Sequence, residues 1–88
     1  MNHLIEKLEQ LYAKEAVLDE RLSTCLAYQT AILDFTIQEG YRSHRTVIED
    51  IMFAVHRVEM DLRMESCRLK LEKVLLSSEI RSTEGATT

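Results

Sequence analysis

The segment Glu39-Gly40-Tyr41-Arg42-Ser43 separates two long stretches that both have the apolar spacing of helices. Gly40 is one of only two glycines among the 88 residues, and the chain contains no proline. Glycine can adopt the left-handed conformation that commonly ends a helix, so this segment predicts one turn. The sequence therefore predicts an all-α protein, a helical hairpin with two long arms.

The arm before the turn places apolar residues at a 4-3 spacing, which is typical of one face of a helix. Ser23 and Thr24 can either cap a new helix or lie inside a continuous one. Two alternatives follow: one helix through this arm, or two helices over about residues 3–22 and 24–38. The apolar members of the series are Leu4, Leu8, Leu11, Leu18, Leu22, Cys25 and Ile32, and its polar members are Glu15, Gln29 and Thr36.

The arm after the turn predicts a helix over residues 44–79, with Ser43 or Thr46 as its N-cap. Such a helix would be about 54 Å long and would carry a second apolar face beyond its seam. We expect another copy of the chain to cover that face, giving a homodimeric helical bundle. The predicted seam is Ile48, Ile51, Val55, Val58, Leu62 and Leu69, flanked by Met52 and Phe53, and the second face is Met60, Met64, Cys67, Leu71, Val74 and Leu75.

Chain length and composition predict one soluble domain over residues 1–76. Residues 77–88 are rich in Ser, Thr and Glu, which favours a flexible tail. The sequence shows neither the pattern of a signal peptide nor a run of about 18 apolar residues, so we expect a cytoplasmic protein without a membrane contact. Cys25 and Cys67 lie far apart and are predicted to be two buried, reduced thiols.

The residue patterns predict neither catalysis nor a bound cofactor. His3, His44 and His56 lack the close ligand pairs of a zinc site. A hairpin also offers no cleft in which a nucleophile and a base, or two carboxylates, would converge. We therefore expect a non-enzymatic protein that binds another protein and holds no metal.

Three clusters are candidate contact sites. The first mixes an aromatic ring with cations at the turn, where it could meet a phosphate or an acidic surface, although a plain polar turn is the simpler and favoured interpretation. It consists of Tyr41, Arg42, His44 and Arg45. The second, with adaptable methionines, is a candidate dimer or partner face. It consists of Met60, Met64, Cys67 and Leu71. The third is basic, and its simpler interpretation is a solvated helix face. It consists of Arg63, Arg68, Lys70 and Lys73.

Three groups of residues carry a resemblance to a known family. They are Ala31, Ile32 and Leu33 ahead of Gly40, then Val47, Ile48, Ile51 and Val55, and last Leu71, Glu72, Lys73, Val74 and Leu75. The final group looks like a Leu-Glu-x-Val-Leu close. With this spacing, about residues 18–76 resemble the small bacterial biofilm-development regulators typified by AriR, also called YmgB.

The resemblance implies an all-helical homodimer that modulates biofilm formation and acid resistance as a connector to two-component or phosphorelay signalling. Family members have also been discussed as DNA-associated regulators similar to the Hha type of nucleoid modulator. The formal charge of −4 argues against broad nucleic-acid binding by this chain. A rival hypothesis is a secretion co-chaperone or phage-type inhibitor that holds a client helix against the second apolar face.

Overall fold

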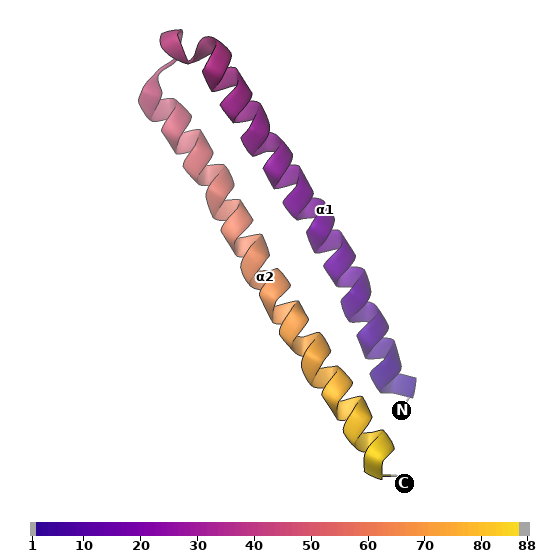
Figure 1. Cartoon of the computed structure of the whole chain (residues 1–88). Coiled ribbons are helices and arrows are strands. Elements are labelled where there is room, and N and C mark those ends of the chain that lie inside the picture. The colour runs from indigo at the N-terminus through magenta and orange to yellow at the C-terminus, as the bar shows by residue number, and fades with distance from the viewer. Residues whose placement is uncertain (1, 87–88) are drawn as a thin grey trace.

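The computed structural model describes the backbone of residues 2–86 and the side chains of residues 3–83. Helix α1 spans Asn2–Glu39, a 3-10 turn η1 spans Gly40–Arg42, and helix α2 spans Arg45–Ala86. The two helices run antiparallel beside each other, with the turn at one end and both termini at the other (Figure 1). The predicted all-α hairpin is confirmed over the described residues.

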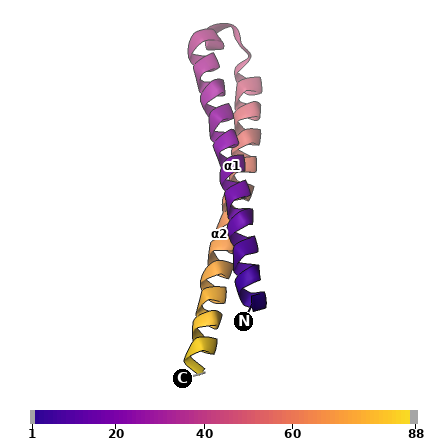
Figure 2. The same ribbon diagram turned by 90° about the vertical axis from the view of Figure 1, so that its right-hand side faces the viewer.

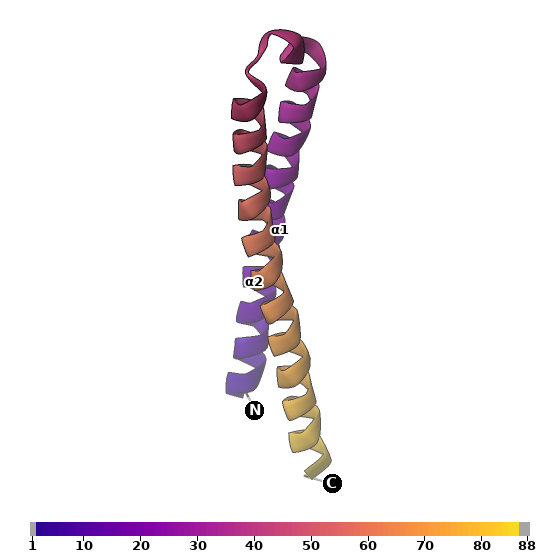
Figure 3. The ribbon, with the colours of Figure 1, turned by 90° about the vertical axis from the view of Figure 1, so that its left-hand side faces the viewer.

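The hairpin is long and thin. Its Cα atoms span 70 × 16 × 15 Å, and its radius of gyration is 20.0 Å, against about 12 Å for a compact domain of this length. Views along the edge show the two helices crossing near the middle (Figures 2 and 3). The accessible surface of 6978 Å² exceeds by about 1,700 Å² the value expected for a globular chain of this mass.

Helix α1 is continuous, which decides between the two alternatives for this arm. The Thr24 hydroxyl donates a 3.0 Å hydrogen bond to the Glu20 carbonyl inside the helix and caps nothing. Every member of the predicted 4-3 series, from Leu4 to Thr36, is buried or half-buried. An apolar series repeating every seven residues keeps facing its partner only when two helices wind around each other. The first arm is therefore one of the two helices of an antiparallel coiled coil.

Helix α2 follows the same repeat, but its seam differs from the prediction. Ile51 and Val58 are about half exposed, at 49% and 53%, so placing them in the seam was wrong. The repeat instead brings Met52 and the charged Glu59 inward, each one position further along. The observed seam is Ile48, Met52, Val55, Glu59, Leu62, Ser66, Leu69, Lys73, Leu76 and Ile80.

The turn is built differently from the expectation. Neither Gly40 nor any other described residue has a positive φ, so the left-handed helix end was a wrong prediction. A Cβ atom at position 40 would lie 3.2 Å from Thr36 Cγ2, which makes glycine the residue that fits best there. Ser43 is not the N-cap of α2, because its hydroxyl donates to the Glu39 carbonyl at 2.9 Å. The His44 carbonyl accepts the first bonds of α2, so Thr46 already lies within the helix.

The most deeply buried apolar cluster lies in the half of the hairpin near the termini. Leu11 and Leu18 of α1 pack there with Leu69 and Leu76 of α2, and Ile80 packs against them. The seam therefore extends past residue 76, and α2 continues through the segment predicted as a tail. Residues 87 and 88 of that segment lie outside the described residues. Over the described part, neither helix is apolar enough along its length to cross a bilayer.

Candidate interaction surfaces

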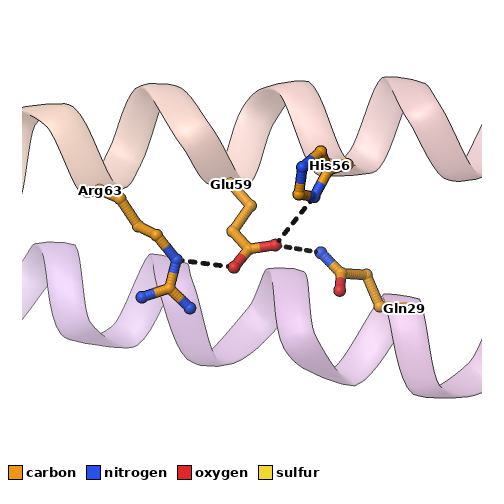
Figure 4. Close-up of polar contacts among 4 residues, drawn as sticks. All are labelled: Gln29, His56, Glu59 and Arg63. Atoms are coloured by element: carbon orange, nitrogen blue, oxygen red, sulfur yellow. Dashed lines mark hydrogen bonds and ion pairs between the residues drawn. The ribbon is translucent and has the colours of Figure 1, made fainter.

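A polar network occupies the middle of the seam. Gln29 Nε2 of α1 donates a 2.7 Å hydrogen bond to Glu59 Oε1 of α2, and Arg63 Nε donates to Glu59 Oε2 at 2.7 Å (Figure 4). His56 Nδ1 lies 3.4 Å from Oε1 of the same carboxylate. The hydrogen bonds from Gln29 and Arg63, assisted by the charges of Arg63 and His56, lower the pKa of Glu59 against the opposing effect of desolvation. Glu59 is thereby kept as an anion within a coiled-coil seam.

A second polar contact crosses the seam nearer the termini. Lys73 Nζ lies 2.9 Å from Glu15 Oε1 and 2.8 Å from Oε2, and both side chains are about one-fifth exposed. The same ammonium lies 4.5 Å from the centre of the Tyr12 ring, a cation-π contact. Within the described residues no hydrogen-bond partner is found for the buried Oε2 atom, and its ion pair with Lys73 is what compensates its charge. Lys73 thus acts inside the hairpin and does not belong to a surface patch.

These two contacts fix one register for the whole hairpin. Glu15 and Gln29 are 14 residues apart on α1, and their partners Lys73 and Glu59 are also 14 residues apart on α2. Two heptads separate the contacts on both helices, so every level between them keeps the same alignment. At any point along the hairpin, this register therefore determines which residue of α1 lies beside which residue of α2.

The turn cluster predicted from the sequence is mostly neutralised within the chain. Tyr41 is 84% exposed, and the Arg42 guanidinium lies 5.9 Å from its ring centre. Arg42 pairs with Glu39 at 2.6 Å, and Arg45 pairs with Glu49 at 2.9 Å. His44 is exposed beside them. This cluster presents an aromatic ring on a charge-balanced surface, which weakens its suitability as an anion site.

The second candidate face forms an exposed stripe on the back of α2, away from the seam. Met64 is 63% exposed and Leu71 is 59% exposed. Cys67 is exposed as well, so the prediction that both thiols are buried holds only for Cys25. We call this set the back stripe, and its members are Met60, Met64, Cys67 and Leu71.

The basic cluster does not exist as one patch. Arg63 is bound to Glu59, and Lys73 is bound to Glu15 across the seam. Arg68 and Lys70 remain exposed on α2. Among the side chains of residues 3–83, no three from His, Cys, Asp or Glu come close enough together to hold a metal ion.

An open apolar groove lies near the turn, and the sequence did not predict it. It has a volume of about 500 Å³ and lies between the two helices. The seven-residue spacing of Tyr28 and Phe35 was the available signal, since both directly precede seam residues. Its lining includes Tyr28, Ala31 and Phe35 from α1 and Val47, Ile48 and Ile51 from α2.

The fold and its contacts define an antiparallel two-helix coiled coil with polar contacts in its seam and uncovered apolar surface on both helices. Comparison with known protein families, curated proteins and solved structures finds no match to this chain.

Proposed function

We propose that this chain is a non-enzymatic regulatory protein that forms a homodimeric helical bundle and acts by binding another protein. The observation that supports this proposal is the exposed apolar surface. Phe35, Ile51 and Leu71 are each about half exposed or more, as are many other large apolar side chains. Monomeric proteins seldom leave apolar surface of this extent in water, and such patches usually mark interaction sites.

The charges that the fold brings together support binding rather than catalysis. Glu59 is held by Gln29 and Arg63, and Glu15 is held by Lys73. In each contact the opposite charge or the hydrogen-bond donor satisfies the carboxylate, and both contacts connect side chains that pack the seam. Their role in this proposal is to fix the geometry of the hairpin.

The regulatory role itself rests on the resemblance of residues 18–76 to the AriR (YmgB) biofilm and acid-resistance regulators. In this proposal the dimer acts in the cytoplasm as a connector to a signalling protein. A pull-down from the native host with the tagged chain tests this role. Recovery of a two-component or phosphorelay protein is the expected result, and recovery of a secretion or phage protein instead would replace it.

The exposed back stripe favours one alternative function, a co-chaperone or inhibitor that holds a client helix. Met60 and Met64 offer flexible side chains that adapt to different partners. A client holder would use this stripe as a monomer, so the oligomeric state separates the two functions. Sedimentation equilibrium should give twice the 10.2 kDa mass of one chain. A stable monomer would contradict the proposed function.

DNA association of the Hha type is a further alternative that the charges disfavour. Arg42 and Arg45 at the turn are paired with acidic residues, and the whole chain carries −4. A gel-shift titration at low salt tests it, because phosphate contacts bind most tightly there. Binding that weakens steeply as salt is added would favour the DNA alternative.

A further inference from the structure

One edge of the hairpin carries matched rows of side chains. Each heptad has two seam residues, a first one and another three positions after it. We call this edge the g edge, since its residues directly precede the first seam residue of each heptad. Its charged members are Lys7, Lys14 and Arg21 on α1 and Glu65, Glu72 and Glu79 on α2, all of them exposed. Lys7, Glu72 and Glu79 line one shallow groove, which shows that both rows lie on the same side of the seam.

The same edge becomes apolar towards the turn. Tyr28 and Phe35 continue the row on α1, and Ile51 and Val58 continue the row on α2. Tyr28, Phe35 and Ile51 line the groove near the turn. The g edge is therefore charged in the half near the termini and apolar in the half near the turn.

The register of the hairpin aligns these rows level by level. Given the Glu15–Lys73 contact, Lys14 lies two residues, or about 3 Å along the axis, from the exact level of Glu72, and the Gln29–Glu59 contact relates Tyr28 to Val58 in the same way. We call two residues this close along the axis level with each other. The remaining levels follow from the heptad repeat. Lys7 then lies level with Glu79, Arg21 with Glu65, and Phe35 with Ile51. At each of the five levels a cation of α1 lies level with an anion of α2, or an apolar residue of α1 lies level with an apolar residue of α2.

We propose that a second copy of this chain docks on the g edge, with the twofold axis along the hairpin and both turns at the same end. This inference rests on the proposed homodimer and specifies its interface. A twofold axis in that direction places α1 of one copy against α2 of the other at the same level. Each cation of α1 then faces an anion of the second copy, and Tyr28 and Phe35 face its Val58 and Ile51.

The opposite orientation does not match. Turning one copy end over end would place α1 against α1, so that Lys7, Lys14 and Arg21 would face either one another or the apolar half. Like charges at close range and charges against apolar surface both oppose association. The distribution of charge along the g edge therefore selects the orientation as well as the edge.

On the other edge of the seam, most residues of α1 and α2 that lie level with each other are not complementary. We call it the e edge, since its residues directly follow the other seam residue of each heptad. At its levels Leu33 lies opposite His56, and Leu26 lies opposite Arg63. Asp19 opposite Lys70 is its one complementary level. Docking a second copy on the e edge would bury the Arg63 cation and the polar imidazole of His56 against leucines, which is unfavourable.

One further observation favours the g edge, and the total exposed surface is large enough for a dimer interface. None of the ion pairs among side chains 3–83 joins its cationic row to its anionic row, so both rows are available to another copy. A standard interface buries about 800 Å² on each partner. The hairpin exposes about twice that area beyond the expectation for its mass, which is enough to provide such an interface.

A matched pair of variants tests the edge. Ile51→Glu changes an apolar residue of the g edge to an acid, and Leu71→Glu makes the same kind of change on the back stripe. Both positions are exposed in the hairpin, so circular dichroism should show retained helicity. Sedimentation should give a monomer for Ile51→Glu and a dimer for Leu71→Glu.

The other outcomes overturn the inference in distinguishable ways. A dimer that survives Ile51→Glu, or that is lost in both variants, would move or extend the interface beyond the g edge and leave the proposed homodimer standing. A wild-type chain that sediments as a monomer would overturn the homodimer itself.

A spin label at the turn tests the orientation. Tyr41→Cys, combined with Cys25→Ala and Cys67→Ala, allows one label per chain at an exposed position. Double electron–electron resonance should give a label separation much shorter than the hairpin. A separation approaching the 70 Å length of the hairpin would show the end-over-end arrangement and overturn the orientation, even if the mass is that of a dimer.

Discussion

Gln29 Nε2 and Glu59 Oε1 lie 2.7 Å apart across the hairpin, and this hydrogen bond places a charged residue of α2 opposite one position of α1. A slip of one heptad in one direction would set Glu59 against Leu22 and Lys73 against Leu8. Both charges would then face leucines, which is costly inside a seam. Polar seam residues can specify register in coiled coils, and here two such contacts define one alignment.

The stability of the hairpin should depend on pH through Glu59. Its pKa is lower in the folded hairpin than in the unfolded chain. Ionised Glu59 therefore stabilises the fold above the unfolded pKa of about 4.3, and this contribution is lost as the pH falls through the lowered folded value. Urea denaturation across that acid range should show a steeper loss of stability for the wild type than for Glu59→Gln. Equal slopes would contradict the prediction.

The contact between Glu15 and Lys73 should show energetic coupling. Lys73→Leu leaves the Glu15 carboxylate facing an apolar side chain and should lower the free energy of unfolding by about 1–3 kcal/mol. Adding Glu15→Leu removes the unpaired charge and should restore wild-type stability or exceed it. A double-mutant cycle from denaturant melts should give a coupling of about 1 kcal/mol or more. Additive effects of the two changes would show that the pair contributes nothing.

Two leucines on α2 provide a direct test of the seam. Leu69 is 7% exposed and packs in the core, whereas Leu71, two positions on, is 59% exposed. Leu69→Ala should cost about 2–5 kcal/mol, because it leaves a cavity in the seam. Leu71→Ala should change the free energy of unfolding by about 0.5 kcal/mol or less. Similar losses of unfolding free energy for both variants, measured by urea denaturation, would show that the seam is assigned to the wrong residues.

The sequence predicts the first arm better than the second, for a physical reason. In α1 the series from Leu4 to Ile32 is mostly apolar, so its repeat is legible even with Glu15 and Gln29 inside it. In α2 the seam contains Glu59, Ser66 and Lys73, whose burial depends on partners from the other helix. Apolar spacing alone therefore leads to Ile51 and Val58, which are exposed.

The surfaces were harder to predict than the fold. The turn cluster is visible as a run in the sequence, and the back stripe is visible as residues at helical spacing. The g edge is visible only after the register between the arms is known, because it combines residues such as Arg21 and Glu65 from both helices. That register depends on the Gln29–Glu59 and Glu15–Lys73 contacts, which periodicity within one helix does not contain.

Gly40 provides a test of the turn. Its φ angle is not positive, so an alanine can adopt the same backbone, and the nearest obstacle is Thr36 Cγ2 at 3.2 Å from the added Cβ atom. The entropy that alanine removes from the unfolded chain opposes this tight contact. Gly40→Ala should therefore change the free energy of unfolding by less than about 1 kcal/mol. A much larger loss in thermal or urea melts would indicate a left-handed residue at this position.

The two cysteines should differ in their reaction with a thiol reagent. Cys67 lies exposed on the back stripe, whereas Cys25 is buried in the seam at 7% exposure. Cys25 can react only when the hairpin opens locally, so its rate should follow the local stability of the seam. Mass spectrometry after brief labelling should find Cys67 modified first, and Cys25 modified at a comparable rate only in denaturant.

The g-edge dimer leaves the back stripe uncovered, so Cys67 should stay reactive at concentrations where the chain is dimeric. Protection of Cys67 on dimerisation would instead locate the interface on the back stripe, and Cys67→Ser provides the control that assigns the fast-reacting thiol.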